Sequence, residues 1–321
     1  MKILITGGGG FLGFRLAQAL LARGQLGGKP ITSLTLLDGA FPPAAAQEPR
    51  LRAVTGDVSD AKTLAQVCPP DTDAVFHLAA VVSGAAEADF DLGMRVNLKG
   101  TELLLETMRR CATPPRLVYT SSVAAFGGVL PAVLDDATIA NPQTSYGTQK
   151  VIGEYLVSDY SRKGFLDGRS LRLPTIVVRA GKPNAAASSF ASGILREPLN
   201  GELSECPVAP ETGVWLLSPR RVVDAFIHAW ELPADAWGTQ RWLNLPGITA
   251  SVAEMLEALK RVAGAKVAGR VVFKPDARIQ AIVKTWPVNF RTPRALQMGF
   301  RADPDVDTVI RDYLADERIK V

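Results

Sequence analysis

Tyr146 and Lys150, a tyrosine and a lysine four residues apart, form the pair in this sequence best suited to acid–base chemistry. In a helix, residues at this spacing share one face, so the lysine ammonium can stand beside the phenol. A free tyrosine titrates near pH ~10, and a nearby cation favours the phenolate, which makes a general base near neutral pH possible. Because many helices carry this spacing by chance, the pair needs partners from the rest of the chain.

A glycine cluster follows the first apolar run. Residues 2–6 are short and apolar, as expected for a buried strand of a parallel sheet, and residues 11–22 have helical periodicity. Between them Gly7, Gly10 and Gly13 are spaced as GxxGxxG. Glycines at a strand-to-helix turn let the backbone approach a pyrophosphate, which the positive end of the helix attracts. The pattern therefore predicts a dinucleotide site.

An acidic residue ends the next predicted strand. Residues 31–37 are rich in Ile, Leu and Thr, and Asp38 follows them, where the ribose hydroxyls of a bound dinucleotide would lie. A carboxylate there accepts a hydrogen bond from the 2′-hydroxyl and repels a 2′-phosphate. The sequence therefore favours NAD over NADP, although an insertion at residues 25–30 places the acid farther from the glycines than usual.

Strands and helices alternate through the first half of the chain. Periodicity and capping residues predict strands at 51–55, 74–80, 117–120 and 171–178, a helix capped by Ser59 or Asp60 that ends at Val67, and helices at about 87–110 and 146–162. This alternation predicts an α/β fold built on a doubly wound parallel sheet, the Rossmann arrangement. Such sheets bind ligands at the carboxyl ends of their strands.

The rhythm becomes irregular after residue 180. Helices are predicted at 221–230, 251–263 and 305–314, and a strand at 241–245. We expect an NAD-binding domain over residues 1–170, to which residues 220–245 return. The expected substrate-binding domain is smaller, of mixed α/β type, and consists of residues 171–219 and 246–321.

The composition limits the classes of function. The chain has 321 residues, is 47% hydrophobic and carries a net charge of +4 without a basic tract, so nothing indicates a nucleic-acid partner. Its three cysteines have no CxxC spacing and its two histidines no metal-ligand spacing, so no metal site is expected. We interpret His77, which has apolar neighbours, as structural. With no signal region and no apolar run of about 18 residues, we expect a cytoplasmic protein without a membrane partner.

Together these motifs resemble those of the extended short-chain dehydrogenase/reductases, the NAD-dependent epimerase/dehydratase family. The loop from Thr6 to Gly13 is similar to the family's cofactor loop, and Tyr146 with Lys150 matches its YxxxK motif. Ser122 stands where the family has a catalytic serine, and the resemblance covers roughly the first 180 residues. The cofactor contacts that it implies are Gly7, Gly10, Phe11, Leu12, Gly13, Asp38, Asp57, Val58, Leu78, Ala79, Ala80, Asn97, Tyr146, Lys150 and Pro174.

The resemblance also implies a mechanism and an assembly. Ser122 would hydrogen-bond the reacting oxygen, Tyr146 would accept the hydroxyl proton, and Lys150 would lower the pKa of the tyrosine while holding the nicotinamide ribose. NAD would accept the hydride. Members of the family usually pair through two helices of the larger domain, so a homodimer is expected. The presence of Ser122, Tyr146 and Lys150 together argues against a protein that senses a dinucleotide without catalysing a reaction.

The chain departs from the nucleotide-sugar members of the family where they bind substrate. Thr175 replaces the asparagine that usually touches the sugar nucleotide, and residues 217–224 lack the usual histidine before a VxD segment. Residues 173–184, with Trp286-Pro287, are similar to a subgroup that oxidises the 2-hydroxyl of D-erythronate, a four-carbon sugar acid. The alternative is a nucleotide-sugar epimerase or dehydratase that recycles a tightly held NAD.

A sugar-acid substrate is an anion, so its carboxylate needs cations or N–H donors. The candidates for the carboxylate are Arg179, Lys182 and Arg220. Those for the remaining hydroxyls are Asn184 and Ser218. Ser122 and Thr175 complete the predicted substrate-binding set.

Overall fold

The computed structural model describes residues 1–43, 45, 48, 50–181 and 188–321. The chain divides into two compact units. Unit 1 consists of Met1–Ala125, Thr144–Arg172 and Val223–Leu243, and unit 2 of Phe126–Gln143, Leu173–Val222 and Asn244–Val321. The segment 126–143, which the predicted boundaries leave in the first domain, thus groups with unit 2. The division of cofactor and substrate binding between the units remains a prediction.

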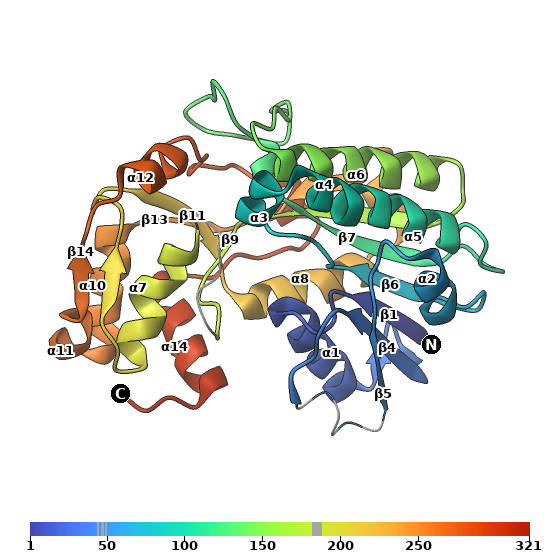
Figure 1. Cartoon of the computed structure of the whole chain (residues 1–321), viewed down its shortest axis with the longest axis horizontal. Coiled ribbons are helices and arrows are strands. Elements are labelled where there is room, and N and C mark those ends of the chain that lie inside the picture. The colour runs from blue at the N-terminus through green and yellow to red at the C-terminus, as the bar shows by residue number, and fades with distance from the viewer. Residues whose placement is uncertain (44, 46–47, 49, 182–187) are drawn as a thin grey trace. The chain divides into compact units, whose positions relative to one another are not determined.

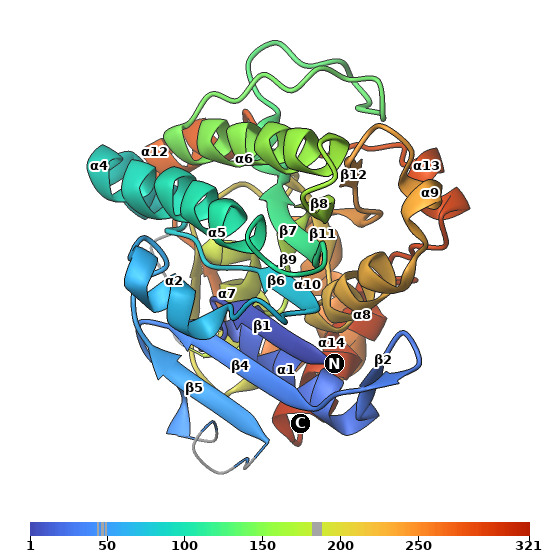
Figure 2. The same ribbon diagram turned by 90° about the vertical axis from the view of Figure 1, so that its right-hand side faces the viewer.

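A seven-stranded sheet forms the centre of unit 1, in the order β12-β8-β7-β6-β1-β4-β5 (Figure 2). The strands are β1 (Lys2–Thr6), β4 (Ser33–Asp38), β5 (Leu51–Thr55), β6 (Ala74–His77), β7 (Arg116–Ser122), β8 (Asp167–Leu173) and β12 (Trp242–Asn244). The pairs β5/β4, β4/β1, β1/β6 and β6/β7 are parallel. The chain winds outward from β1 in one direction and then from β6 in the other, so the predicted doubly wound fold is confirmed. The order reverses between β1 and β6, where such sheets bind ligands.

Helices cover both faces of this sheet. Helices α2, α5 and α6 lie on one face, and α1 and α8 on the other (Figure 2). Their bounds are α1 (Phe11–Arg23), α2 (Ala61–Val67), α5 (Gly100–Met108), α6 (Ser145–Arg162) and α8 (Pro219–Glu231). With both faces covered, the central strands are apolar and buried; Ile5, Phe76 and Val118 have no exposed surface.

The helix predicted at about 87–110 is wrong as one continuous element. The structure has α3 (Ser83–Ala88), α4 (Phe90–Gly93), a π-helical segment η2 (Met94–Lys99) and then α5. Asp89 interrupts the first part, because its carboxylate accepts a hydrogen bond from the backbone N–H of Leu92 at 2.9 Å and so caps a new helix. The π segment carries Asn97, whose position matters for the site.

The strand predicted at 171–178 is also divided. Strand β8 ends at Leu173, and the short strand β9 (Thr175–Ile176) pairs instead with β11 (Gly213–Leu217) in unit 2. Pro174 separates the two strands because proline has no backbone N–H to donate to a ladder. The division of the chain into units coincides with this break.

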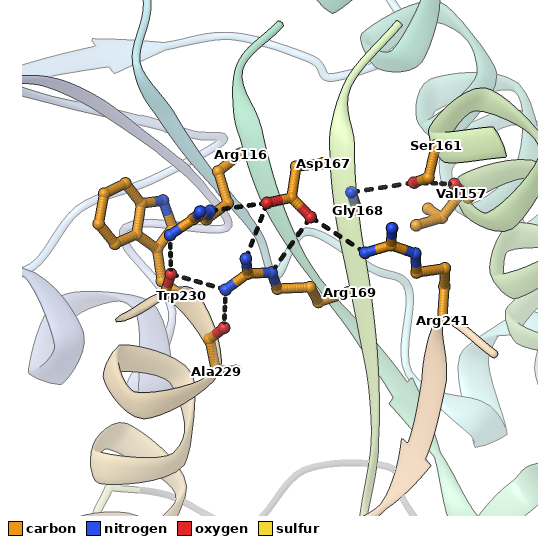
Figure 3. Close-up of polar contacts among 9 residues, drawn as sticks. All are labelled: Arg116, Val157, Ser161, Asp167, Gly168, Arg169, Ala229, Trp230 and Arg241. Atoms are coloured by element: carbon orange, nitrogen blue, oxygen red, sulfur yellow. Dashed lines mark hydrogen bonds and ion pairs between the residues drawn. The ribbon is translucent and has the colours of Figure 1, made fainter. Parts of the chain in front are cut away.

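At the amino-terminal ends of β7 and β8, three arginines surround Asp167 (Figure 3). Its carboxylate accepts hydrogen bonds from Arg116 at 2.9 Å, Arg169 at 2.7 Å and Arg241 at 3.1 Å. Arg116 and Arg169 also donate to the carbonyl oxygen of Trp230 near the end of α8, at 2.5 and 2.6 Å. This cluster attaches the segment 223–243 to the sheet. Its arginines also donate hydrogen bonds to a carbonyl group at the carboxyl end of α8, where the helix dipole favours cations.

Unit 2 has its own sheets and core. Strand β11 pairs with β9 and, antiparallel, with β13 (Ile248–Ser251), while β10 (Ser204–Cys206) pairs with β14 (Val271–Phe273). Helices α7 (Ser189–Leu199), α10 (Val252–Ala263) and α14 (Val306–Glu317) enclose a core that includes Ile194, Leu259 and Ile310. Helix α10 begins with a capping box between Ser251 and Glu254.

The smaller elements are labelled in Figures 1 and 2 where there is room. They are β2 (Gln25–Leu26), β3 (Lys29–Pro30), the 3₁₀ turn η3 (Val123–Ala125), α9 (Ala234–Trp237), α11 (Ala265–Ala268), α12 (Ala277–Val283) and α13 (Pro293–Gln297). Within the described ranges, every helix is too short or too polar to cross a bilayer.

Candidate active site

Helix α6 places Tyr146 and Lys150 one turn apart. The side chain of Thr144 accepts a hydrogen bond from the backbone N–H of Gly147 at 3.1 Å, and this N-cap starts the helix at Ser145. The Nζ atom of Lys150 lies 5.6 Å from the centre of the Tyr146 ring. The predicted face-sharing of the two side chains is therefore present in the structure.

Lys150 is buried with a defined set of neighbours. Its side chain is 2% exposed, and its Nζ donates a hydrogen bond to the carbonyl oxygen of Thr120 at 2.7 Å. The same atom lies 4.9 Å from the centre of the Tyr119 ring, so the ammonium is in contact range of the rings of both Tyr119 and Tyr146. These contacts hold the lysine at the carboxyl end of β7.

Burial sets the proton affinity of this lysine. Removal from water lowers the pKa of Lys150 to about 7, and the carboxylate of Glu154, one turn farther along α6, opposes the shift. Lys150 can therefore exist in both protonation states near neutral pH. Buried groups with strongly shifted pKa values are found preferentially at functional sites, and Lys150 is such a group.

Ser122 ends β7, two residues after the carbonyl group that Lys150 binds. Its hydroxyl oxygen accepts a hydrogen bond from the backbone N–H of Ala124 at 3.1 Å, and the side chain is half-buried. The three residues predicted to be catalytic thus come from α6 and from the strand against which α6 packs. Their catalytic roles remain predictions.

The loop after β1 is drawn so tightly that only glycine fits. A Cβ atom at Gly7 would lie 2.6 Å from the backbone nitrogen of Ala79, and Gly7 has a φ of +71°. At Gly9 it would lie 1.9 Å from the carbonyl oxygen of Ala40, and at Gly13 2.1 Å from that of Gly7. This bare backbone, followed by the start of α1 at Phe11, fits the pyrophosphate of a dinucleotide.

Asp38 joins β4 to this loop. Its carboxylate accepts hydrogen bonds from the backbone N–H groups of Gly9 at 3.0 Å and Gly10 at 3.1 Å, and from that of Gly39 at 2.7 Å. The carboxylate therefore lies beside the glycine loop, where a ribose hydroxyl could reach it. Its predicted role in NAD selection fits this position.

Two of the predicted cofactor contacts, Asp57 and Val58, follow the end of β5. The carboxylate of Asp57 accepts hydrogen bonds from the backbone N–H of Ser59 at 2.8 Å and from Arg95. Val58 is buried, and a Cβ atom at Gly100 would lie 2.9 Å from its side chain. Asp57 and Val58 are thus held against the start of α5.

The segment after β6 is tied to the glycine loop and to α6. The backbone N–H of Leu78 donates to the carbonyl oxygen of Thr6 at 3.0 Å, and the backbone of Leu78 and Ala79 lies beside Gly7. The amide of Asn97 bonds both backbone groups of Val81, at 2.7 and 3.1 Å, and donates to the side chain of Gln149 at 2.8 Å. Asn97 therefore positions this segment; a direct contact with the cofactor stays a prediction.

His77 fits the structural interpretation. It is fully buried, and its two ring nitrogens lie 2.6 Å from the hydroxyl of Thr6 and 2.9 Å from that of Thr101. Burial and the charge of Lys150 lower the pKa of His77 to about 3, so the ring is neutral.

The predicted substrate residues of unit 2 differ in their surroundings. Pro174 is buried and Thr175 is half-buried in β9. Arg179 donates its backbone N–H to the hydroxyl of Ser192 at 3.1 Å, and its guanidinium donates to Ser188 at 3.3 Å. Lys182 and Asn184 lie outside the described residues.

Ser218 and Arg220 have carboxylate partners. The hydroxyl and the backbone N–H of Ser218 both donate to Asp303, each at 2.7 Å. The guanidinium of Arg220 donates to Asp312 at 2.5 Å and to Asp316 at 2.6 Å. Because these contacts join α8 to α14 and the segment before it, we do not propose either residue as a substrate ligand.

Sequence patterns do not reveal three buried residues: Tyr119 and Glu154, which act on Lys150, and Arg172, which pairs with Glu154. Glu154 could have been noticed, because it follows Lys150 at the i,i+4 spacing of a helical ion pair. Arg172, at the end of β8, gives no comparable signal.

A family model described as the NAD dependent epimerase/dehydratase family matches residues 3–227. The chain belongs to this family. NAD is the cofactor of the family, and the glycine loop with Asp38 fits it. The predicted family resemblance and the predicted cofactor are confirmed.

Similar proteins cover nearly the whole chain. A D-erythronate dehydrogenase of Cupriavidus necator is 58% identical over 320 residues, with 98% of each chain covered. A D-erythronate dehydrogenase of Haemophilus influenzae is 44% identical over 314 residues, covering 98% of this chain and 99% of the relative. A crystal structure described as a nucleoside-diphosphate-sugar epimerase of Agrobacterium tumefaciens has a TM-score of 0.94 at 42% identity, covering 99% of this chain and 94% of that one.

Proposed function

We propose that this protein oxidises the 2-hydroxyl group of D-erythronate to the 2-oxo acid, with NAD as the oxidant and Tyr146 as the base. The observation that carries the proposal is the buried Lys150 beside Tyr146 and Ser122, in a chain 58% identical to a D-erythronate dehydrogenase. The assignment of an oxidoreductase agrees with both dehydrogenase relatives.

The proton of the substrate hydroxyl passes to the phenolate oxygen of Tyr146. The ammonium of Lys150, 5.6 Å from the ring centre, favours that phenolate. The hydroxyl of Ser122 donates a hydrogen bond to the reacting oxygen and orients it toward the tyrosine. A bound NAD would supply the hydride acceptor for the carbon that carries the hydroxyl.

The substrate carboxylate needs a cation that can form paired hydrogen bonds. We therefore propose Arg179 as the residue that binds the substrate carboxylate. Thr175, four residues earlier in the sequence, remains in the proposed substrate-binding set. Replacing Arg179 with methionine should raise the KM for D-erythronate by about tenfold or more while kcat changes less, because it removes a charge-assisted contact made in the ground state.

A panel of sugar acids and nucleotide sugars, each added with NAD and followed by NADH absorbance, tests the proposal. We expect D-erythronate to give the highest rate. If none of the sugar acids led to NADH formation, the proposed substrate class would be refuted.

A nucleotide-sugar epimerase is the second candidate, because the similar Agrobacterium tumefaciens structure is described as one. An epimerase returns its hydride to the substrate and therefore accumulates no NADH. Analysis of the nucleotide-sugar products from the same panel separates the two activities.

We also propose a homodimer that pairs through α5 and α6. On α6 the apolar side chains of Ile152 and Tyr155 are exposed, at 36% and 60%. Light scattering should give twice the chain mass for the wild type and the mass of a single chain for Tyr155→Glu; a monomeric wild type would contradict this proposal.

A cytoplasmic location and a part in carbohydrate metabolism complete the proposed function, and cell fractionation tests the location.

A further inference from the structure

A second arginine–carboxylate pair lies at the other end of β8 from the Asp167 cluster. Arg172 donates two hydrogen bonds to Glu154 of α6, from Nε at 2.8 Å and from Nη2 at 2.6 Å. Both side chains are almost completely buried, at 5% and 2% exposed. Parallel sheets bind ligands at this carboxyl end of their strands.

Glu154 also reaches the strand that carries the proposed catalytic serine. The hydroxyl of Ser121 donates to its Oε1 atom at 2.5 Å, and Ser121 directly precedes Ser122. One carboxylate therefore connects α6 with the ends of β7 and β8. Lys150 and Tyr146 occupy the preceding turns of the same helix.

We propose that Glu154 is a positioning residue of the Ser122–Tyr146–Lys150 site. It fixes α6 against the ends of β7 and β8 and places a negative charge one turn from the Lys150 ammonium. The inference rests on the proposed function in assigning these three residues to the reaction.

The charges around Lys150 support this assignment. Tyr119 of β7 and Tyr146 of α6 face the ammonium with their rings, and His77 of β6 is neutral. Glu154 is thus the carboxylate that favours the protonated form against the effect of burial, while Arg172 balances its charge.

If the Glu154–Arg172 pair were only structural, replacing it would affect at most the stability of the protein and leave its catalysis unaffected. Exchanging a buried pair for apolar residues of similar volume often leaves stability unchanged or raises it, whereas removing one partner is strongly destabilising. A double variant, Glu154→Leu with Arg172→Met, can therefore separate folding from catalysis.

The experiment compares Glu154→Gln, the double variant and Ser121→Ala with the wild type, using thermal unfolding, the pH profile of kcat/KM, and NADH affinity as a function of pH. We expect the alkaline limb of kcat/KM in Glu154→Gln to move to lower pH, because Lys150 loses its proton more easily. At pH ~8 the loss should approach about tenfold for each unit by which the variant lowers the pKa of Lys150, because above the pKa the charged fraction falls by about that factor per unit.

The pH at which NADH binding weakens should move in the same direction, because Lys150 is proposed to hold the ribose in its charged form. The double variant should regain the wild-type unfolding temperature but keep the low kcat/KM. Ser121→Ala, a milder change, should fold and lower kcat with little change in KM. Asp167→Asn is the matched control, because Asp167 is a carboxylate with arginine partners at the other end of β8 from Arg172. This variant should lose stability and keep the wild-type pH profile.

Wild-type kcat/KM and an unshifted NADH profile in the double variant would overturn the proposal, as would wild-type kcat in Ser121→Ala. If the wild type forms no NADH from D-erythronate, the proposed substrate fails, and the pH dependence of NADH binding in Glu154→Gln still decides the role of Glu154.

Discussion

A Cβ atom at Gly153 would lie 2.3 Å from the hydroxyl oxygen of Tyr119. Gly153 is on α6 and Tyr119 is on β7, so the missing side chain sets how closely the helix carrying Tyr146 and Lys150 approaches the strand. The contact is fully buried at Tyr119. Close packing of α6 against β7 is therefore a requirement of the candidate site.

Gly153→Ala should destabilise the protein even though alanine favours helices. Overpacking costs about 1–3 kcal/mol, which the better helix propensity of alanine offsets by about 1 kcal/mol. We expect a net loss in the free energy of unfolding, measured with urea, together with a lower kcat. Thr148→Ala, at an exposed position of α6, is the control. Equal stability of the wild type and Gly153→Ala would show that α6 can move away without cost.

Burial of Lys150 predicts a pH-dependent stability. Its pKa is lowered to about 7 in the folded chain, against about 10.4 in an unfolded one, so between these values only the unfolded chain holds the proton. Wild-type stability should thus rise with pH through this window. Below pH ~7 both states are protonated, and the cost of the buried charge is fully present.

Lys150→Met removes this cost. Its advantage in unfolding free energy over the wild type should be largest below pH ~7 and should shrink by a few kcal/mol toward pH ~10. Urea unfolding at several pH values measures the difference. An advantage that stays constant across this range would mean that the lysine titrates normally in the folded chain.

Asp38 should control the choice between NAD and NADP. Its carboxylate contacts the backbone N–H groups of Gly9 and Gly10 and would repel a 2′-phosphate. Asp38→Ser should lower the ratio of kcat/KM for NAD to that for NADP by about tenfold or more, as expected for loss of hydrogen bonds to a charged group. The KM for D-erythronate serves as the control and should not change. An unaltered ratio would place cofactor selection elsewhere.

Asp167 should matter for stability and not for chemistry. Asp167→Asn leaves Arg116, Arg169 and Arg241 without their common carboxylate (Figure 3). We expect a loss of about 3 kcal/mol in the free energy of unfolding, because the fully buried guanidinium of Arg169 and the partly buried ones of Arg116 and Arg241 lose their counter-charge. Below the unfolding transition kcat should equal that of the wild type. A strong loss of kcat in the folded variant would show that the two ends of β8 are coupled.

Much of unit 1 could be predicted because its signals are local. At the glycines after β1, neighbouring backbone atoms come too close for a side chain to fit. The spacing of these glycines in the sequence therefore indicates the predicted cofactor loop directly. The alternation of apolar runs with helical periodicity identifies the sheet. Tyr146 and Lys150 are recognisable because one helix holds both.

What the sequence does not reveal depends on contacts between distant segments. Arg220 has the chemistry of a carboxylate ligand, and only the fold brings it to Asp312 and Asp316. Glu154 and Arg172 meet because α6 lies over β8, which periodicity cannot show. The break at Asp89 depends on a single capping side chain that competes with a continuous helix.

The most direct test of the central claim is the turnover of Tyr146→Phe with D-erythronate and NAD, measured beside NADH affinity. Loss of the phenolic base should lower kcat by about 10²–10⁴-fold, the usual contribution of general acid–base catalysis, while NADH still binds. A kcat close to that of the wild type, with cofactor binding intact, would contradict the assignment of Tyr146 as the base.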